Sequence, residues 1–294
     1  MPSRPRAWLE DGALAAIAGH EIYVHASGGG EGLPVLFLHG YPSSSYDWRG
    51  VIEKLGDRRT VCFDFLGFGL SEKPPDQTYS LNLQADIAEA VWRRSGGGPV
   101  LLVAHDMGTS VATELLARDI AGELEMELAG VLLFNGSMIL DRASLTLAQK
   151  VLRSRLGPLL ARLSNERVFR AQFARLFSAD HPLDPREAAD QWALLANRGG
   201  HRILDRLTYY LHERVQFAER WHGALRDWPG RLELAWGMRD PVATGAVLDA
   251  ILELRPAAPV TRLENLGHYP QLERPDRLAE LIGGFDATAP ASLG

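Results

Sequence analysis

Short apolar runs recur along the chain, and most are separated by stretches in which apolar residues repeat at helical spacing. Such runs, flanked by turn-forming residues, are typical of buried strands. The sequence predicts strands at His20–His25, Val35–Leu38, Thr60–Phe63, Val100–Ala104, Val131–Phe134, Leu232–Trp236 and, with a weaker pattern, Val260–Leu263. Strands that alternate with helices indicate an α/β fold, with a mostly parallel, doubly wound sheet covered on both faces.

This alternation stops after Asn135. From Ser137 to Trp228 no stretch has the pattern of a strand, and the segment is rich in Leu, Arg and Ala. An insertion at this point would lie above the carboxyl ends of the strands, where open α/β sheets bind ligands. We interpret the chain as a core formed by residues 1–136 and 229–294, with residues 137–228 inserted as a helical lid.

Composition excludes several classes of function. The chain has 294 residues, of which 46% are apolar, and a net charge of −6, so it lacks the basic balance of a nucleic-acid-binding protein. Cys62 is the single cysteine and lies in an apolar run, which rules out a disulfide within the chain and predicts a buried thiol. No stretch is long enough to span a membrane, and the apolar segment Ala13–Ala18 is too short for a signal peptide. We therefore expect a cytoplasmic protein.

The strand at Val100–Ala104 runs into Ala104-His105-Asp106-Met107-Gly108, and a helical pattern follows. A small residue, a nucleophile and a glycine at this spacing form a nucleophile elbow, here with Asp106 in the position where lipases carry serine. An aspartate at this point can also be an ordinary helix N-cap. His105 and Asp106 lack further ligands at suitable spacing, so we expect no metal.

The first strand of the core ends in His39-Gly40-Tyr41-Pro42. A His-Gly pair after this strand is the usual place for one half of an oxyanion hole. The expected donors are the backbone N–H groups of Tyr41 and Met107. Gly40 and Pro42 also suit a simple turn.

Two further strand ends carry the remaining groups of a catalytic triad. Asp240 follows the strand at Leu232–Trp236, and His268 follows the last strand. The order nucleophile, acid, histidine is the one found in α/β-hydrolases and differs from that of other triad enzymes. Each signal alone fits a turn, but together they predict that Asp106, Asp240 and His268 form one site.

On these residues the chain resembles the epoxide hydrolase and haloalkane dehalogenase branch of the α/β-hydrolase superfamily. The likeness covers nearly the whole chain and is closest in His39–Trp48, Asp64–Ser71 and Gly267–Glu273. These stretches, together with Tyr210–Arg214, are also similar to the mesoderm-specific transcript proteins. The resemblance implies an α/β-hydrolase fold and a hydrolase that needs no cofactor.

An aspartate nucleophile narrows the reaction. A carboxylate is ionised at neutral pH, because its reference pKa is about 3.9, and its attack on a saturated carbon gives an ordinary ester. Epoxides and alkyl halides offer such a carbon together with a leaving group, so we expect a small apolar molecule as the substrate. The ester on Asp106 would then be hydrolysed by water that His268 activates, with Asp240 orienting the imidazole.

The leaving group separates these two substrate classes, since an alkoxide needs a proton donor and a halide needs N–H donors. The resemblance implies that Tyr210 is the proton donor, with its neighbour Tyr209 as the alternative. Met107 offers no side-chain N–H to a halide. We therefore expect an epoxide hydrolase, with a haloalkane dehalogenase and a relative with altered or lost catalysis as alternatives. Between Ser137 and Trp192 there is no tyrosine to act as a second donor.

Overall fold

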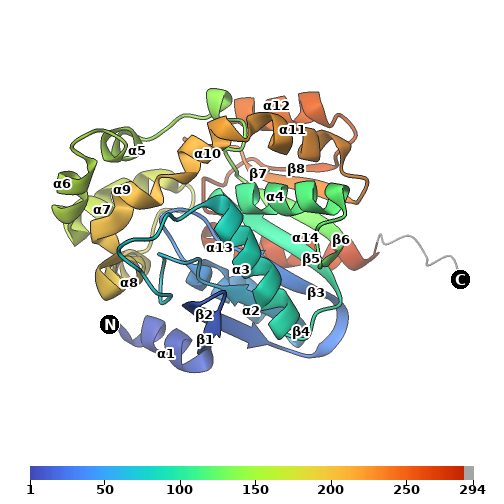
Figure 1. Cartoon of the computed structure of the whole chain (residues 1–294), viewed down its shortest axis with the longest axis horizontal. Helices are drawn as coiled ribbons and strands as arrows, with labels where there is room; N and C mark the ends of the chain where they lie inside the picture. Colours follow the sequence, from blue (N-terminus) through green and yellow to red (C-terminus); the bar gives the residue numbers. More distant parts are fainter. Residues whose placement is uncertain (288–294) are drawn as a thin grey trace, which may run out of the picture.

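The structure is a computed structural model that describes residues 1–287. Within these residues an eight-stranded sheet has the order β1-β2-β4-β3-β5-β6-β7-β8 (Figure 1). The strands are β1 (Ala13–Ile17), β2 (His20–Ser27), β3 (Gly30–Leu38), β4 (Arg58–Phe63), β5 (Pro99–His105), β6 (Glu127–Phe134), β7 (Leu232–Gly237) and β8 (Val260–Leu263). The β1–β2 and β2–β4 pairs are antiparallel and the remaining pairs are parallel. This confirms the predicted mostly parallel sheet, and every predicted strand falls within an observed one.

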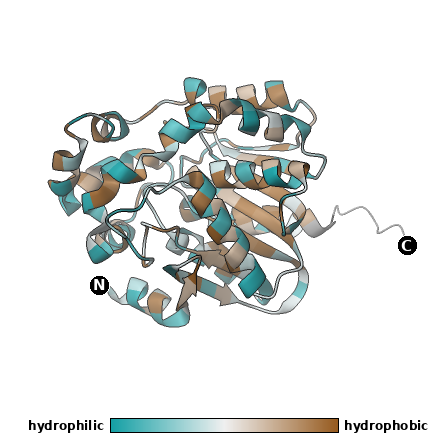
Figure 2. Cartoon of the chain, in the orientation of Figure 1, coloured by the Kyte–Doolittle hydropathy of each residue, from teal (hydrophilic) through white to brown (hydrophobic). Residues whose placement is uncertain are grey.

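Successive side chains of a strand point to opposite faces of the sheet, and both faces of its central strands are buried. In β3, Leu36 and Leu38 contribute to one hydrophobic cluster, while Val35 and Phe37 contribute to the other. Both faces are covered by helices, which is why the central parts of the strands are mostly apolar, as their colouring in Figure 2 shows. The core helices are α1 (Ser3–Asp11), α2 (Arg49–Leu55), α3 (Leu81–Arg94), α4 (Met107–Ala121), α12 (Gly245–Leu254), α13 (Pro270–Glu273) and α14 (Pro275–Ala287), with the 3₁₀ helix η1 (Ser45–Trp48).

Between β6 and β7 the described elements are all helical. They are η2 (Leu140–Arg142), α5 (Leu147–Leu152), α6 (Gly157–Arg162), α7 (Glu166–Phe173), η3 (Ala174–Leu176), α8 (Pro185–Ala196), η4 (Asn197–Ile203), α9 (Leu204–Leu207), α10 (Tyr210–Gln216) and α11 (Ala218–Asp227). We call residues 140–227 the helical insertion. Its helices α5 to α9 gather at one end of the molecule, while α11 packs against α4 of the core (Figure 1).

Polar contacts join the helical insertion to the core. The Arg4 side chain of α1 donates to the Asp190 carboxylate of α8 at 2.6 Å. The Glu213 carboxylate of α10 accepts a hydrogen bond from the backbone N–H of Leu81, at the start of α3, at 2.7 Å. These contacts hold the inserted helices over the carboxyl ends of the strands.

Two expectations from composition can be compared with the structure. Cys62 is a free, buried cysteine in β4, as predicted. None of the helices in residues 1–287 combines the length and the apolar character needed to cross a membrane.

Candidate active site

Asp106 lies at a sharp turn between β5 and α4. Its backbone has φ 48° and ψ −111°, a conformation that residues with side chains rarely adopt. The turn brings α4 so close to β3 that a Cβ on Gly108 would lie 2.6 Å from the carbonyl oxygen of His39. A Cβ on Gly40 would lie 2.6 Å from the Cβ of Asp106. Only glycine fits at these two positions, of which Gly108 belongs to the predicted elbow and Gly40 to the loop after β3.

The Asp106 carboxylate does not cap α4, because its side chain makes no capping hydrogen bond to that helix. Its Oδ1 instead accepts a hydrogen bond from the backbone N–H of Tyr41 at 2.8 Å. Met107 is the first residue of α4, so its N–H is one of those without an acceptor inside the helix. The two predicted oxyanion donors therefore come from the loop after β3 and from the amino end of α4.

His268 lies between the two aspartates, and all three side chains are buried. Its Nδ1 is 2.7 Å from Oδ2 of Asp240, and its Nε2 is 3.8 Å from Oδ2 of Asp106. Burial alone would lower the pKa of His268, but the carboxylates of Asp240 and Asp106 raise it above its usual value. With Nδ1–H directed at Asp240, the lone pair of Nε2 faces the Asp106 side.

Asn135 holds Asp240 in place, a role that the sequence pattern did not predict. Its Nδ2 donates to Asp240 Oδ2 at 2.8 Å, and its Oδ1 accepts the backbone N–H of Gly237 at 2.8 Å. The backbone N–H groups of Val242 and Ala243 donate to the other oxygen of Asp240 at 2.6 and 3.1 Å. The available signal was the position of Asn135 directly after β6, beside the ends of β5 and β7.

His105 supports the backbone at His268. Its Nε2 lies 2.7 Å from the carbonyl oxygen of His268, and its Nδ1 lies 3.0 Å from Nε2 of Gln271. Burial, followed by the nearby His268, lowers the pKa of His105 to about 3, so this ring is neutral. Within residues 1–287, no group of three or more His, Cys, Asp or Glu side chains is arranged to hold a metal ion.

Tyr210 is buried at the start of α10, and its ring centroid lies 5.5 Å from that of Tyr41. The Tyr210 hydroxyl oxygen accepts a hydrogen bond from Nε2 of Gln149 at 3.0 Å. Gln149 Oε1 accepts the backbone N–H of Thr146 at 2.8 Å in a capping box of α5, which sets the direction of the amide. The phenol proton is therefore free to be donated elsewhere. Burial and the charge of Asp106 raise the pKa of Tyr210 above its usual value.

A buried guanidinium, that of Arg214, lies beneath Tyr210 and Asp106. It donates to the hydroxyls of Ser110 and Ser137 at 2.8 and 2.6 Å and to the carbonyl oxygen of Asp106 at 3.2 Å. Its Cζ is 4.6 Å from the centre of the Tyr210 ring. Burial lowers the pKa of Arg214 below its usual value, because its effect is larger than that of the nearby Tyr210 and Asp106, which would raise the pKa. This side chain joins α10 of the insertion to the turn at Asp106, a contact that no local pattern predicts.

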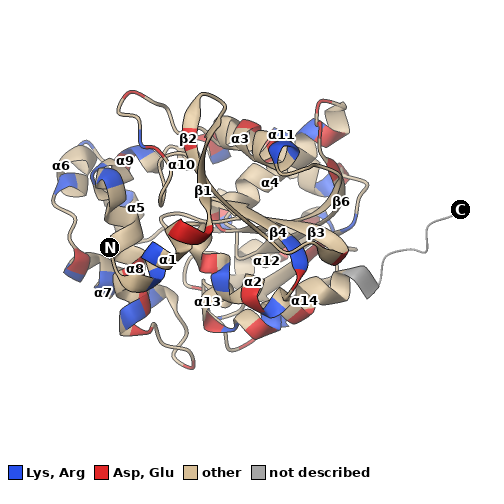
Figure 3. Cartoon of the chain, turned by 90° about the horizontal axis from the view of Figure 1, so that it is seen from below, with Lys and Arg blue, Asp and Glu red and all other residues tan. Residues whose placement is uncertain are grey.

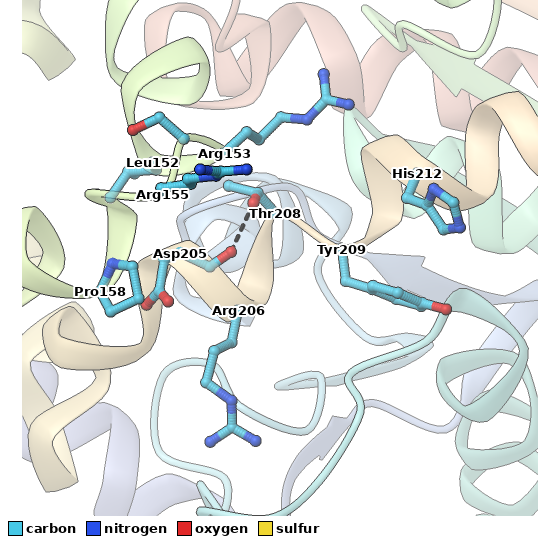
Figure 4. Close-up of a pocket in the computed structure, with 10 residues that line it drawn as sticks. Leu152, Arg153, Arg155, Pro158, Asp205, Arg206, Thr208, Tyr209 and His212 are labelled. Carbon is cyan, nitrogen blue, oxygen red and sulfur yellow. Dashed lines mark hydrogen bonds between the residues drawn. The ribbon is translucent and has the colours of Figure 1, made fainter.

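Tyr209, the alternative proton donor, lies elsewhere. Its side chain is 37% exposed and its ring contacts that of His212. It lines a hollow of about 380 Å³ on the helical insertion, together with residues such as Arg153, Arg155 and Asp205 (Figure 4). The structure thus brings Tyr210 to the triad side of α10 and leaves Tyr209 at the surface.

Comparisons with known proteins agree with this architecture. A model of the alpha/beta hydrolase family matches residues 35–281. A protein named hydrolase LipZ from Mycobacterium tuberculosis is 51% identical over 275 residues, covering 94% of this chain and 95% of its own. The mesoderm-specific transcript homolog protein of Homo sapiens is 35% identical over 291 residues, covering 95% of this chain and 86% of its own.

Two further matches concern named enzymes. A soluble epoxide hydrolase from Corynebacterium sp. is 40% identical over 100 residues, which cover 33% of this chain and 34% of that protein. The crystal structure of the haloalkane dehalogenase DbeA from Bradyrhizobium elkani superposes with a TM-score of 0.78 at 24% identity, covering 94% of this chain and 98% of that one. The second match concerns the fold alone.

Proposed function

The chain belongs to the alpha/beta hydrolase family, and within it we propose an epoxide hydrolase that forms a covalent ester on Asp106. The observation that carries this proposal is the buried Tyr210 hydroxyl, held by Gln149 at 3.0 Å with its proton free. Its ring lies against Tyr41, whose N–H binds the Asp106 carboxylate. The opening of an epoxide requires a nucleophile on one side of the ring and an acid on the other, because attack displaces the ring oxygen from behind, and Asp106 and Tyr210 would supply these two groups.

In the first step, Oδ2 of Asp106 attacks a ring carbon of the epoxide. Oδ1 is occupied by the Tyr41 N–H, and Oδ2 is 3.8 Å from His268, too far for a direct hydrogen bond, so Oδ2 is the free oxygen. A carbon–oxygen bond to Asp106 forms as the ring carbon–oxygen bond breaks. The electron pair goes to the ring oxygen, which takes the proton of Tyr210. Arg214, 4.6 Å from the ring centre, stabilises the phenolate left behind.

In the second step, water attacks Cγ of Asp106. His268 Nε2 takes the proton of this water, and Asp240 stabilises the resulting imidazolium across the 2.7 Å contact. The negative charge on the carboxyl oxygen faces the N–H groups of Tyr41 and Met107. Collapse breaks the bond between Cγ and Oδ2, the oxygen attached to the substrate carbon, and Oδ2 takes a proton from His268. The diol leaves with Oδ2 of Asp106, the new Asp106 carboxyl group releases its remaining proton, and Tyr210 regains one from solvent.

The experiment is a panel of epoxides and short bromoalkanes, with diol and bromide measured in parallel on the purified chain. Diol formation, together with a single turnover in water enriched in heavy oxygen that puts the label on Asp106 and not in the diol, supports the proposal. Label in the diol after one turnover contradicts the covalent ester. Absence of both products favours a relative with altered or lost catalysis.

A haloalkane dehalogenase is the second candidate, and the Gln149 amide favours it. A departing halide needs N–H donors, and Gln149 Nε2 carries two N–H bonds beside the Tyr210 hydroxyl. The Gln149 amide thus offers a departing halide the side-chain N–H donor that Met107 lacks. Bromide release without diol formation in the panel would select this reaction over epoxide opening.

A further inference from the structure

The helical insertion carries charge of the opposite sign to the rest of the chain. Residues 141–177 contain eight Lys and Arg and two Asp and Glu, a net charge of +6, whereas the whole chain has −6 and the remaining residues −12. The basic residues are Arg142, Lys150, Arg153, Arg155, Arg162, Arg167, Arg170 and Arg175. Figure 3 shows Lys and Arg on α6 and α7 at this end of the molecule. Such a charge separation within one chain indicates a face that meets an anionic partner.

Large apolar side chains are exposed on the same helices. Leu147 of α5 is 77% exposed, and Leu156, Leu159 and Leu163 around α6 are 61%, 56% and 63% exposed. The spacing of three and four residues places the last three on one side of α6. Single exposed leucines are common, but several on neighbouring short helices form an apolar patch that indicates an interaction surface.

The opposite sides of these helices pack against other parts of the protein. On α5, Gln149 is buried and reaches Tyr210, and α6 packs against η4 and α9. The leucines therefore face outward at the end of the molecule where α5 and α6 lie together in Figure 1. We call Leu147, Leu156, Leu159 and Leu163 with the surrounding arginines the outer face of the insertion.

We propose that this outer face docks on an anionic lipid bilayer surface. Short amphipathic helices with leucines in the middle and arginines beside them bind in the plane of the interface, where the leucines enter the acyl boundary and the guanidinium groups meet headgroup phosphates. Each Lys or Arg near an anionic surface adds attraction. A second copy through the same face is disfavoured, because residues 141–177 carry a net charge of +6 in each copy and would repel each other.

The hollow in Figure 4 adjoins this face and adds a place for a headgroup. Arg153 and Arg155 line it together with the carboxylate of Asp205, and Arg155 directly precedes Leu156 in the sequence. Arg206 also lines it, but its guanidinium donates to the carbonyl oxygen of Gln77 at 2.7 Å and points away. Docking here would present the insertion to apolar substrates dissolved in the bilayer. Only this last consequence rests on the proposed function, since docking itself requires no turnover.

The test is flotation of the purified full chain with vesicles of phosphatidylcholine alone and of phosphatidylcholine mixed with phosphatidylglycerol. We expect binding to the mixed vesicles, weakened by salt, and little binding to phosphatidylcholine alone. Replacing the three leucines around α6 together (Leu156→Ser, Leu159→Ser, Leu163→Ser) should lower the partition constant at least about tenfold. The matched control is Ile120→Ser with Val215→Ser, which removes exposed apolar side chains outside the outer face and should leave binding unchanged.

Two charge-reversal variants distinguish docking through the outer face from attraction by the overall charge of the chain. Arg162→Glu on α6 and Arg94→Glu at the end of α3 change the net charge equally, but only the first should lower binding, by about tenfold. Equal loss in both variants, binding without lipid charge, or no vesicle binding at all would overturn the proposal. So would self-association that the leucine variant abolishes in the absence of vesicle binding, because the face would then join two copies.

Discussion

The side-chain nitrogen of Gln149 donates a hydrogen bond to the hydroxyl oxygen of Tyr210 at 3.0 Å. The two residues lie far apart in the helical insertion, one on α5 and the other at the start of α10. The amide occupies a place beside the phenol that could hold a second donor, in a segment that contains no tyrosine from Ser137 to Trp192. A leaving oxygen that reaches Tyr210 would therefore also meet the Gln149 amide.

Tyr210→Phe should remove the proton donor and leave the packing of the ring nearly unchanged. We expect the rate of ester formation from an epoxide to fall by about 10²- to 10⁴-fold, as for the loss of a general acid. Rapid-quench measurement of the covalent ester checks this rate. Tyr209→Phe is the matched control, because that ring lies at the surface, and its rate should stay within a factor of two or so of the unsubstituted chain. Equal losses in both variants would contradict the assignment.

Gln149→Met keeps the length of the side chain but removes its N–H groups. If the amide supports the leaving group, the rate of epoxide opening should fall about tenfold, the value of one neutral hydrogen bond. A structural role alone would lower the melting temperature and leave the rate per folded molecule unchanged. Thermal unfolding and burst kinetics on the same samples distinguish these outcomes.

His268→Ala should stop the second step and leave the first intact. The alkyl ester would accumulate on Asp106, because no base remains to activate water. Intact-protein mass spectrometry with a proven substrate should show a stable increase equal to the substrate mass, and peptide mapping should place it on Asp106. Asp106→Ala is the control and should show no increase. A modified residue other than Asp106 would refute the assigned nucleophile.

The acid limb of the pH–rate profile should report His268. The base works only when neutral, and the carboxylate of Asp240, which stays charged while Asp106 is esterified, raises its pKa, so hydrolysis of the ester should fail as pH drops through a value above that of a free histidine. Asp240→Asn removes one raising charge. It should move the acid limb to lower pH and slow the reaction by roughly three to four orders of magnitude. Asp141→Asn, at an exposed position on η2, should leave the limb in place.

Glu213 should make stability depend on pH. Burial raises the pKa of this carboxyl from 4.5 to about 7, although the Leu81 N–H opposes the shift. A raised pKa means that the protonated form suits the folded state, so its contribution is complete below pH 4.5 and is lost as pH rises through about 7. Glu213→Gln keeps an acceptor for Leu81 and carries no charge. The difference in melting temperature between this variant and the unsubstituted chain should therefore shift in favour of the variant as pH rises from 5 to 8.

The control for Glu213 is Glu219→Gln, at an exposed position on α11. Its melting temperature should follow that of the unsubstituted chain at every pH. If Glu213→Gln also shows a constant difference, Glu213 does not titrate on unfolding in this range. Calorimetry over the same buffers measures both variants.

The sheet could be predicted from the sequence because its strands are apolar on both faces and therefore appear as continuous apolar runs. The set Asp106, Asp240 and His268 could be assembled for a related reason. Parallel strands end at one edge of a sheet, so residues that directly follow different strands become neighbours whatever their separation in sequence. In the structure His268 lies 2.7 Å from Asp240 and 3.8 Å from Asp106. Their chemical roles remain predictions.

Other parts of the site depend on contacts that leave no local pattern. Gln149 and Arg214 meet around Tyr210 only because the inserted helices fold back onto the strand ends. The resemblance favoured Tyr210 over Tyr209, but the helical pattern alone could not separate them, since adjacent residues on a helix differ by only about 100° in direction. Tertiary packing buries Tyr210 and leaves Tyr209 37% exposed. The sequence thus determined which groups stand at the strand ends, and the tertiary structure decided which helix residues face them, because long-range packing sets the rotation of each helix.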